Sequence, residues 1–165
     1  MKRLLTSLIF IVSCVAVSFA TEFDNYMNLL VRQNVVSEIH VSKAMVSMLS
    51  PEVRKKIPLL GKVPEINSVS IYTASDEDAV NKCARAVHNS FMLYNNKMRA
   101  RHHKLLEIKD DKGYTAVYAM ENEKNSGIYD LVVLLTDDGT KGQVIAFEGE
   151  ITPEVLSLIA KSVPK

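Results

Sequence analysis

The sequence predicts a single α+β domain in which an antiparallel β-meander packs against helices. Two observations favour this class. Four apolar, alternating segments follow one another between residues 104 and 150 and are joined by short turns, which is typical of neighbouring antiparallel strands. A long helical period precedes these segments and a capped helix follows them, so helices and strands do not alternate as they do around a doubly wound parallel sheet.

The first half of the chain predicts helices and two strands from the spacing of its apolar residues. Apolar side chains recur at helical spacing over 21–33 and with a period of two over 35–41. Ser42 is suited to cap a short helix, and Ser50-Pro51-Glu52 indicates the start of another, because proline is favoured at the first helical position. A second strand is expected over 66–73.

A long central helix is expected to begin at Ser75. This side chain can cap the helix, with the acidic Asp78 three residues further on. The apolar residues that follow have a clean helical period, which predicts the buried face of the helix. They are Val80, Cys83, Ala84, Val87, Phe91 and Tyr94.

The second half predicts four strands and a C-terminal helix. The strands are expected over 104–109, 114–121, 128–136 and 143–150. Short links rich in aspartate and glycine, at 110–113 and 137–139, are typical of hairpin turns. Thr152-Pro153-Glu154 then predicts a capped helix start, and the helix is expected to bury Val155, Leu156 and Ile159.

The start of the chain predicts export. Lys2 and Arg3 precede an apolar stretch that ends in a small-x-small cleavage site at Ala20, which is the layout of a bacterial secretory signal. We therefore expect residues 1–20 to be a signal peptide that is removed by cleavage before Thr21. The remaining chain has the size of one ordinary domain.

Cys14 leaves a second possibility for the same segment. Ile11-Val12-Ser13-Cys14 loosely resembles the lipobox of lipoproteins, and acylation of this cysteine would tie the protein to a membrane. An uncleaved segment over 4–20 would also act as an anchor, although it is short for a bilayer span. A predicted helix that begins almost at Thr21 leaves little room for a polar tether and favours cleavage and release.

The charge balance bears on possible partners, and the number of cysteines bears on disulfides. The whole chain has a formal net charge of +1. Because residues 1–20 contain two basic side chains and no acidic one, residues 21–165 have a formal charge of −1. This balance provides no long-range field to attract nucleic acid, so no nucleic-acid partner is expected. Cys83 is the one thiol after the signal, so an internal disulfide is not expected.

His102 and His103 are the strongest candidates for chemistry. Adjacent residues of a strand point to opposite faces, so the two imidazoles are not expected to chelate one ion. We therefore expect no catalytic, cofactor-binding or metal-ligating residue and no cofactor. A metal-assisted hydrolase that uses His102 or His103 with carboxylates supplied by the fold stays open as an alternative.

The remaining candidates have structural interpretations. Cys83 is expected to be an inert core cysteine, and His40 is expected to be hydrogen-bonded and partly buried. The basic run over 97–104 is expected to be a solvated helix end, with an anionic partner as the alternative. Most of Met45, Met48, Met92 and Met98 are expected in the core, although a lipid-holding surface is another possibility.

Three segments resemble an exported envelope family of Gram-negative bacteria known as domain of unknown function 4252. They are Val41-Ser42-Lys43-Ala44-Met45, Ile66–Ala74 with the acid-rich helix start after it, and Phe147-Glu148-Gly149-Glu150-Ile151 before a capped helix. The resemblance covers nearly all of residues 21–165. It implies export and an α+β fold, and no active site is attached to the family. Members of such families are often lipoproteins, which keeps Cys14 open.

These observations favour a non-catalytic exported protein that binds an unknown envelope protein or a small ligand. We expect it in the periplasm or outer envelope of a Gram-negative bacterium. A membrane-anchored lipoprotein is the alternative location. The alternative functions are the metal-assisted hydrolase and a small carrier of lipids or other hydrophobic molecules.

Overall fold

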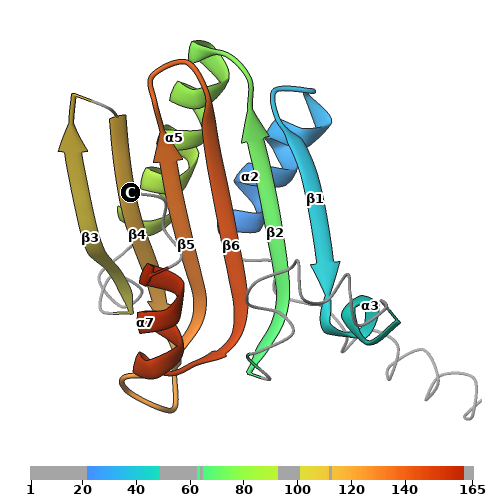
Figure 1. Cartoon of the computed structure of the whole chain (residues 1–165), viewed down its shortest axis with the longest axis vertical. Helices are drawn as coiled ribbons and strands as arrows, with labels where there is room; N and C mark the ends of the chain where they lie inside the picture. The colour runs from blue at the N-terminus through green and yellow to red at the C-terminus, as the bar shows by residue number, and fades with distance from the viewer. Residues whose placement is uncertain (1–21, 49–62, 64, 93–100, 112, 162–165) are drawn as a thin grey trace, which may run out of the picture.

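A six-stranded antiparallel sheet organises the chain, with its strands in the order β1-β2-β6-β5-β4-β3 (Figure 1). The computed structural model describes residues 22–48, 63, 65–92, 101–111 and 113–161. The strands are β1 (Ser37–Ser42), β2 (Ile66–Ala74), β3 (His102–Asp110), β4 (Gly113–Glu121), β5 (Tyr129–Asp137) and β6 (Gly142–Ile151). The described helices are α2 (Glu22–Arg32), α3 (Lys43–Met48), α5 (Glu77–Met92) and α7 (Pro153–Lys161).

The predicted α+β fold and its meander are confirmed. Strands β3 to β6 pair in chain order through antiparallel ladders, as the short predicted turns require. Strand β2 pairs with both β1 and β6, so it joins the N-terminal strand to the meander. All six predicted strands are present, with ends that differ from the predicted ones by at most two residues.

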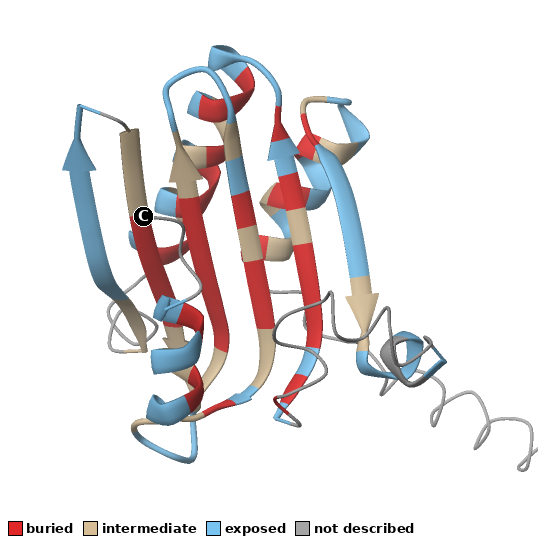
Figure 2. Ribbon diagram, in the orientation of Figure 1, coloured by how far each residue is buried: buried red, intermediate tan, exposed pale blue. Residues whose placement is uncertain are grey.

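Helices cover the two faces of the sheet unequally (Figure 1). On one face, α2 lies behind β1 and β2 while α5 lies behind the meander, and the two helices pack against each other. Their apolar stripes form a core with alternate residues of β2, β4, β5 and β6. On the other face, α7 packs through Val155 and Ile159 on a second core. Figure 2 shows that the buried residues run along the four inner strands, whereas β1 and β3 are largely exposed.

The start of α5 corrects one sequence prediction. Asp76 Oδ1 accepts a hydrogen bond of 2.9 Å from the backbone N–H of Ala79, so Asp76 rather than Ser75 caps this helix. A cap side chain satisfies an N–H of the first turn that has no partner within the helix. The predicted stripe is otherwise confirmed, since Val80, Cys83, Val87 and Phe91 are buried and Ala84 is half-buried. Tyr94 lies outside the described residues.

Helix α7 begins as its sequence predicts. Thr152 provides the cap, because its Oγ1 accepts a hydrogen bond from the backbone N–H of Val155 at 3.4 Å. Pro153 occupies the first helical position, where its missing N–H costs no hydrogen bond. Val155 and Ile159 are buried, and Leu156 is partly buried against the same core.

A β-bulge marks the place where β2 pairs with β6. The register shifts between Ile66 and Ser68, opposite Gly149. A Cβ atom at Gly149 would lie 2.1 Å from the carbonyl oxygen of Glu65, and the residue has φ +152°. That carbonyl also accepts a hydrogen bond of 3.1 Å from the N–H of Glu150. Only glycine permits so close an approach of two backbones.

Several sequence predictions fall outside the described residues. Cys14, Ala20 and Thr21 lie there, as do the helix predicted from Pro51 and residues 97–100 of the basic run. Met98 also lies outside. The expectation that most methionines are in the core is wrong for the other three, because Met45, Met48 and Met92 are exposed. No helix among the described residues is long and apolar enough to cross a bilayer.

Candidate functional site

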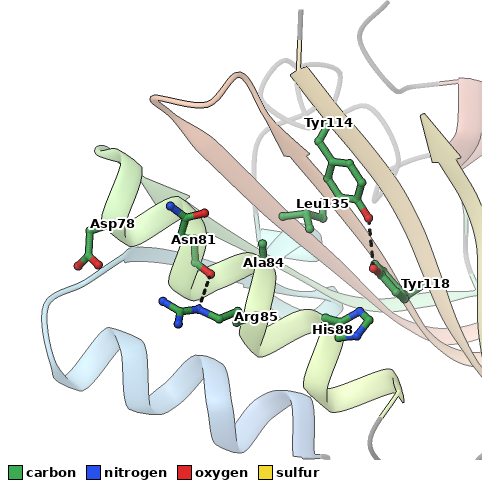
Figure 3. A pocket seen from close by; sticks show the side chains of 8 residues that line it. All are labelled: Asp78, Asn81, Ala84, Arg85, His88, Tyr114, Tyr118 and Leu135. Atoms are coloured by element: carbon green, nitrogen blue, oxygen red, sulfur yellow. Dashed lines mark hydrogen bonds between the residues drawn. The ribbon is translucent and has the colours of Figure 1, made fainter. Parts of the chain in front are cut away.

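A cleft of about 410 Å³ lies between α5 and strands β4 and β5 (Figure 3). We name it the α5–β4 cleft. One wall is a face of α5, the other wall is made by tyrosines of β4, and one residue of β5 contributes to the floor. The lining residues are Asp78, Asn81, Ala84, Arg85, His88, Tyr114, Tyr118 and Leu135.

The helical wall follows from the amphipathic sequence of α5. Asn81, Arg85 and His88 recur at spacings of four and three, so they share a face beside the buried stripe. All three are exposed. Ala84 is short enough to leave space between this face and the sheet, and buried Leu135 makes the floor apolar.

The two tyrosines stand on the same face of β4 because they are four residues apart in a strand. The ring of Tyr118 is buried and packs on Phe91 of α5, with ring centroids 5.3 Å apart. Its hydroxyl oxygen lies 3.4 Å from that of Tyr114. Tyr114 donates a hydrogen bond of 3.0 Å to Glu107 Oε1 of β3. The hydroxyl of Tyr118 is therefore placed by its buried ring and reaches toward the cleft (Figure 3).

The contacts of Tyr114 and Glu107 shift their pKa values in opposite directions. Burial, followed by the hydrogen bonds with Tyr118 and Glu107, raises the pKa of Tyr114 far above its ordinary value. The hydrogen bond from Lys104, followed by the one from Tyr114, lowers the pKa of Glu107. Tyr114 therefore stays a neutral phenol at physiological pH, and Glu107 is a carboxylate.

Charged side chains of both signs surround the cleft. Lys82 pairs with Asp78 on α5, and Lys104 pairs with Glu107 on β3. Arg85 donates from Nε to the carbonyl oxygen of Asn81 at 3.3 Å, and no carboxylate among the described residues forms an ion pair with it. Lys109 stands opposite Tyr114 in the β3–β4 ladder and Asp137 stands opposite it in the β4–β5 ladder, so both are on the same face of the sheet as Tyr114.

His102 and His103 point to opposite faces of β3, as their adjacency predicts. His102 packs edge-on against Phe91 with ring centroids 5.4 Å apart. Burial lowers its pKa, with smaller effects from the charges of Arg101 and His103. His103 lies on the other face, where its Nε2 is 3.3 Å from Glu121 Oε2. The described residues contain no group of three or more His, Cys, Asp or Glu side chains placed to hold one metal ion.

A second cleft, of about 400 Å³, lies at the end of the sheet near the β4–β5 turn. Its lining is polar and consists of Asn67, Asn122, Asn125, Asp130, Gly149 and Glu150. Asn122 donates to Asp130 at 2.7 Å and accepts two backbone N–H groups from the turn. Arg101 also pairs with Asp130, at 3.5 Å. Asn122 and Asp130 therefore hold the turn at this end of the sheet.

The remaining candidates from the sequence are Cys83, His40 and the basic run. Cys83 is buried in the core, as predicted, and burial raises the pKa of its thiol to about 11. His40 Nδ1 lies 2.8 Å from Ser70 Oγ, so the predicted hydrogen bond is present. The imidazole of His40 is nevertheless exposed, because β1 is an edge strand. In the basic run, Arg101 and Lys104 are in ion pairs, and His102 to Lys104 belong to β3 rather than to a helix end.

The sequence-based search missed the residues of the α5–β4 cleft. Arg85 and His88 are exposed helix positions of a common kind, and Tyr114 and Tyr118 fit an ordinary strand. The sequence contains one signal for the cleft. Two tyrosines four apart on a strand share a face, and Asn81, Arg85 and His88 share a face of the preceding helix. That these two faces meet depends on the packing of α5 on the sheet.

A family model described as Domain of unknown function (DUF4252) matches residues 26–159. The chain belongs to the DUF4252 family. The match extends from α2 into α7, so the DUF4252 domain includes the whole sheet and the α5–β4 cleft. The resemblance seen in the sequence is thereby confirmed. No curated protein and no solved structure matches the chain.

Proposed function

We propose that this DUF4252 domain is an exported, non-catalytic binding module that holds its ligand in the α5–β4 cleft. One observation carries this proposal. Polar side chains of a helix and tyrosines of a strand line an open cleft whose floor, at Ala84 and Leu135, is apolar. A few placed polar groups around an apolar surface are the usual composition of a small-molecule site.

The location in the proposal comes from the sequence of residues 1–20. Their basic start, apolar core and small residues before Thr21 support export to the periplasm or outer envelope of a Gram-negative bacterium. The intact mass of the protein isolated from the envelope tests this. A mass that begins at Thr21 is expected, whereas a mass that begins at an acylated Cys14 would replace release by membrane anchoring.

The hydrolase alternative has little support from the positions of its residues. His102 packs on Phe91 on the helical face of β3, and His103 contacts Glu121 on the opposite face. Two imidazoles on opposite faces of a sheet cannot act on the same substrate atom or share one ion, so a hydrolase would have to use one histidine alone, and the described residues offer it no group of three or more metal-ligating side chains.

Molecules that co-purify with the protein test the binding function. The protein is isolated from the envelope under native conditions, and released compounds are identified by mass spectrometry. We expect a small molecule that is lost in an Arg85→Glu variant and retained in an Arg32→Glu variant. Arg32 is the matched control because it is an exposed arginine at the end of α2.

Three outcomes would contradict this function. Bound zinc with a hydrolytic activity lost in His102→Ala or His103→Ala would indicate the enzyme. A phospholipid retained by the Arg85→Glu variant would indicate a hydrophobe carrier that does not use the cleft. A compound retained equally by both arginine variants would place the binding site elsewhere.

A further inference from the structure

We propose that the outer edge of β1 is a docking surface for a second copy of this chain, which adds its own β1 in antiparallel orientation. The two sheets then form one continuous sheet. In this pairing Ile39 stands opposite Ile39 of the second copy, and Glu38 stands opposite His40 of the second copy. This inference goes beyond the proposed binding function and does not depend on the α5–β4 cleft.

The two edges of the sheet differ in how they are protected (Figure 1). An edge strand directs part of its backbone N–H and C=O groups outward, and proteins commonly protect such edges with lysines or β-bulges. The edge strand β3 has both, because it contains Lys104 and Lys109 and its register with β4 shifts between Lys104 and Leu106. Strand β1 contains no lysine and no proline, and its register with β2 is unbroken. Strand β1 is therefore the edge suited to receive another strand.

An apolar row ends at this edge. Ile39 is 61% exposed, and it stands opposite Ile71 of β2, which stands opposite Ile145 of β6. Ile71 and Ile145 are partly buried against the core under α7. A twofold axis perpendicular to the sheet keeps the two faces of the sheet distinct, so pairing at Ile39 continues this row into the second copy. Aliphatic side chains placed opposite each other stabilise such strand pairs.

The side chains that flank Ile39 select the register. Glu38 and His40 share the other face of β1, opposite Tyr72 and Ser70 of β2. A twofold pairing centred on Glu38 places two carboxylates opposite each other, and one centred on His40 places two imidazoles opposite each other. The pairing centred on Ile39 places a carboxylate opposite an imidazole at two sites. Unlike groups attract and like charges repel at such positions, so this register is favoured.

Both flanking side chains can form a further hydrogen bond. Nδ1 of His40 lies 2.8 Å from Ser70 Oγ, which leaves Nε2 for another partner. Glu38 hydrogen-bonds with the hydroxyl of Tyr72, and a carboxylate has room for more than one donor. Nε2–H of His40 can therefore donate to Glu38 of the second copy.

The helices beside β1 favour neither sign of charge at this edge. Helices α2 and α3 together carry two acidic and two basic side chains. These are Glu22, Asp24, Arg32 and Lys43. The attraction between the two copies therefore depends on Glu38 and His40 in β1 itself.

The self-association is expected to be weak, because the pairing covers only Ser37 to Val41 of each copy. A contact below the standard interface size predicts a Kd on the order of 100 µM. Dilute protein, as used for unfolding measurements, is then a monomer. Sedimentation velocity of the protein isolated from the envelope, over a concentration series that spans this value, should show a rise from the mass of one chain to that of two.

Two exposed isoleucines provide a variant and its matched control. Ile39→Lys should raise the Kd roughly tenfold or more, because two lysines then stand opposite each other at the edge. Ile108 is 48% exposed on the other edge strand, β3, and Ile108→Lys should associate as the wild type does. Far-UV circular dichroism checks that both variants keep the fold.

Charge complementation tests the pairing of Glu38 with His40. His40→Glu places carboxylates opposite each other, and the double variant Glu38→Lys with His40→Lys places ammonium groups opposite each other. Each protein alone should stay a monomer at concentrations where the wild type is a dimer, and an equimolar mixture should form the dimer. Loss of the hydrogen bonds to Tyr72 and Ser70 within one chain would not be repaired by mixing, so recovery reports contact between copies.

A disulfide tests the register. In a Cys14→Ser background, Ile39→Cys should form a cross-linked dimer under mild oxidation, because directly opposite residues have Cα atoms about 4.5–5.5 Å apart. Ile108→Cys is the control and should stay a monomer under the same conditions.

Four results would overturn the inference. The wild type could stay a monomer at every concentration, or its dimer could persist in Ile39→Lys and be lost in Ile108→Lys, which would place the contact at β3. The complementary mixture could remain monomeric. Finally, Ile39→Cys could cross-link to a segment of another envelope protein instead of a second copy, which would assign β1 to a different partner.

Discussion

Burial determines the protonation of several single residues in this domain. Desolvation is the largest cause of the raised pKa values of Tyr72 and Cys83 and of the lowered pKa of His102. In each case the neutral form is favoured, because an apolar environment disfavours charge. All three side chains belong to the helical side of the sheet or pack on it, at the core that α2 and α5 cover. These residues therefore report on the integrity of that core.

His102 should make the domain less stable in acid. Its pKa is lowered in the folded protein, so between that value and about 6.5 the unfolded chain binds a proton that the folded chain does not. Stability from this residue is complete above pH 6.5 and is lost as the pH falls. We expect the free energy of unfolding in urea to fall less between pH 7 and pH 5 in His102→Gln than in the wild type.

A substitution that removes no titratable group serves as the control for this effect. Ile39 is exposed on β1, and Ile39→Ala should leave the pH dependence of unfolding as it is in the wild type. An identical slope in the wild type and His102→Gln would contradict the assignment to His102.

Cys83 should resist alkylation while the protein is folded. A thiol with a pKa of about 11 has roughly 100-fold less thiolate at pH 8 than one with the ordinary value near 9, and burial also blocks access. In a Cys14→Ser variant, in which Cys83 is the one thiol, iodoacetamide should modify the native protein at least 100-fold more slowly than the urea-unfolded protein. Comparable rates in the two states would mean that α5 leaves the sheet easily.

At the scale of single elements, three of the four described helices start with a side chain that accepts an N–H group of the first turn. Asp76 serves α5 and Thr152 serves α7, and Ser42 Oγ accepts the N–H of Met45 at 3.3 Å in α3. Such caps decide where a helix begins, because the first turn lacks internal partners. The helix that Asp76 caps carries Arg85 and His88 in the lining of the cleft.

Alanine substitution of Asp76 and of Ser75 tests which of the two residues caps α5. Asp76→Ala should lower the free energy of unfolding by about 1 kcal/mol, because the hydrogen bond to Ala79 is lost. Ser75→Ala should change it by less than about 0.5 kcal/mol. Urea denaturation of the two variants measures both values, and a larger loss for Ser75→Ala would restore the cap predicted from sequence.

Most elements could be predicted from sequence because their signals are local. The alternation within β4, β5 and β6 and the helical period from Val80 to Phe91 each lie within one segment. Asp76 was missed because Ser75 and Asp76 are both good cap residues and only the path of the chain selects one. The place of β2 beside β6, and the presence of Arg85 and Tyr118 in the lining of one cleft, depend on contacts between distant segments.

At the scale of the whole molecule, the inner strands are buried on both faces while the edge strands are exposed. Ile151 is 0% exposed in the core under α7, whereas Ile39 on β1 is 61% exposed. The α5–β4 cleft lies toward the opposite side of the sheet from β1 (Figures 1 and 3). Stability therefore depends on the centre of the sheet, and the exposed edges contribute little to it.

An isoleucine-to-alanine substitution on an inner strand and one on an edge strand should show this contrast in stability. Ile151→Ala removes a fully buried side chain and should cost about 2–5 kcal/mol of unfolding free energy, whereas Ile39→Ala should cost less than about 1 kcal/mol. Urea denaturation measures both in the full chain. Equal losses would mean that β1 is covered in solution by groups outside the described residues.

The bulge at Gly149 has a consequence for how the chain reaches its native state. The β2–β6 ladder runs from Ile66–Gly149 to Ala74–Gly142 and joins residues far apart in sequence, whereas the three ladders within the meander each close a short hairpin. Closing so long a loop carries the largest entropic cost, so we expect this ladder to limit the refolding rate. Gly149→Ala should refold more slowly than the wild type in stopped-flow dilution from urea, while Ile39→Ala refolds at the wild-type rate. A variant that refolds normally but unfolds faster would place this contact after the rate-limiting barrier.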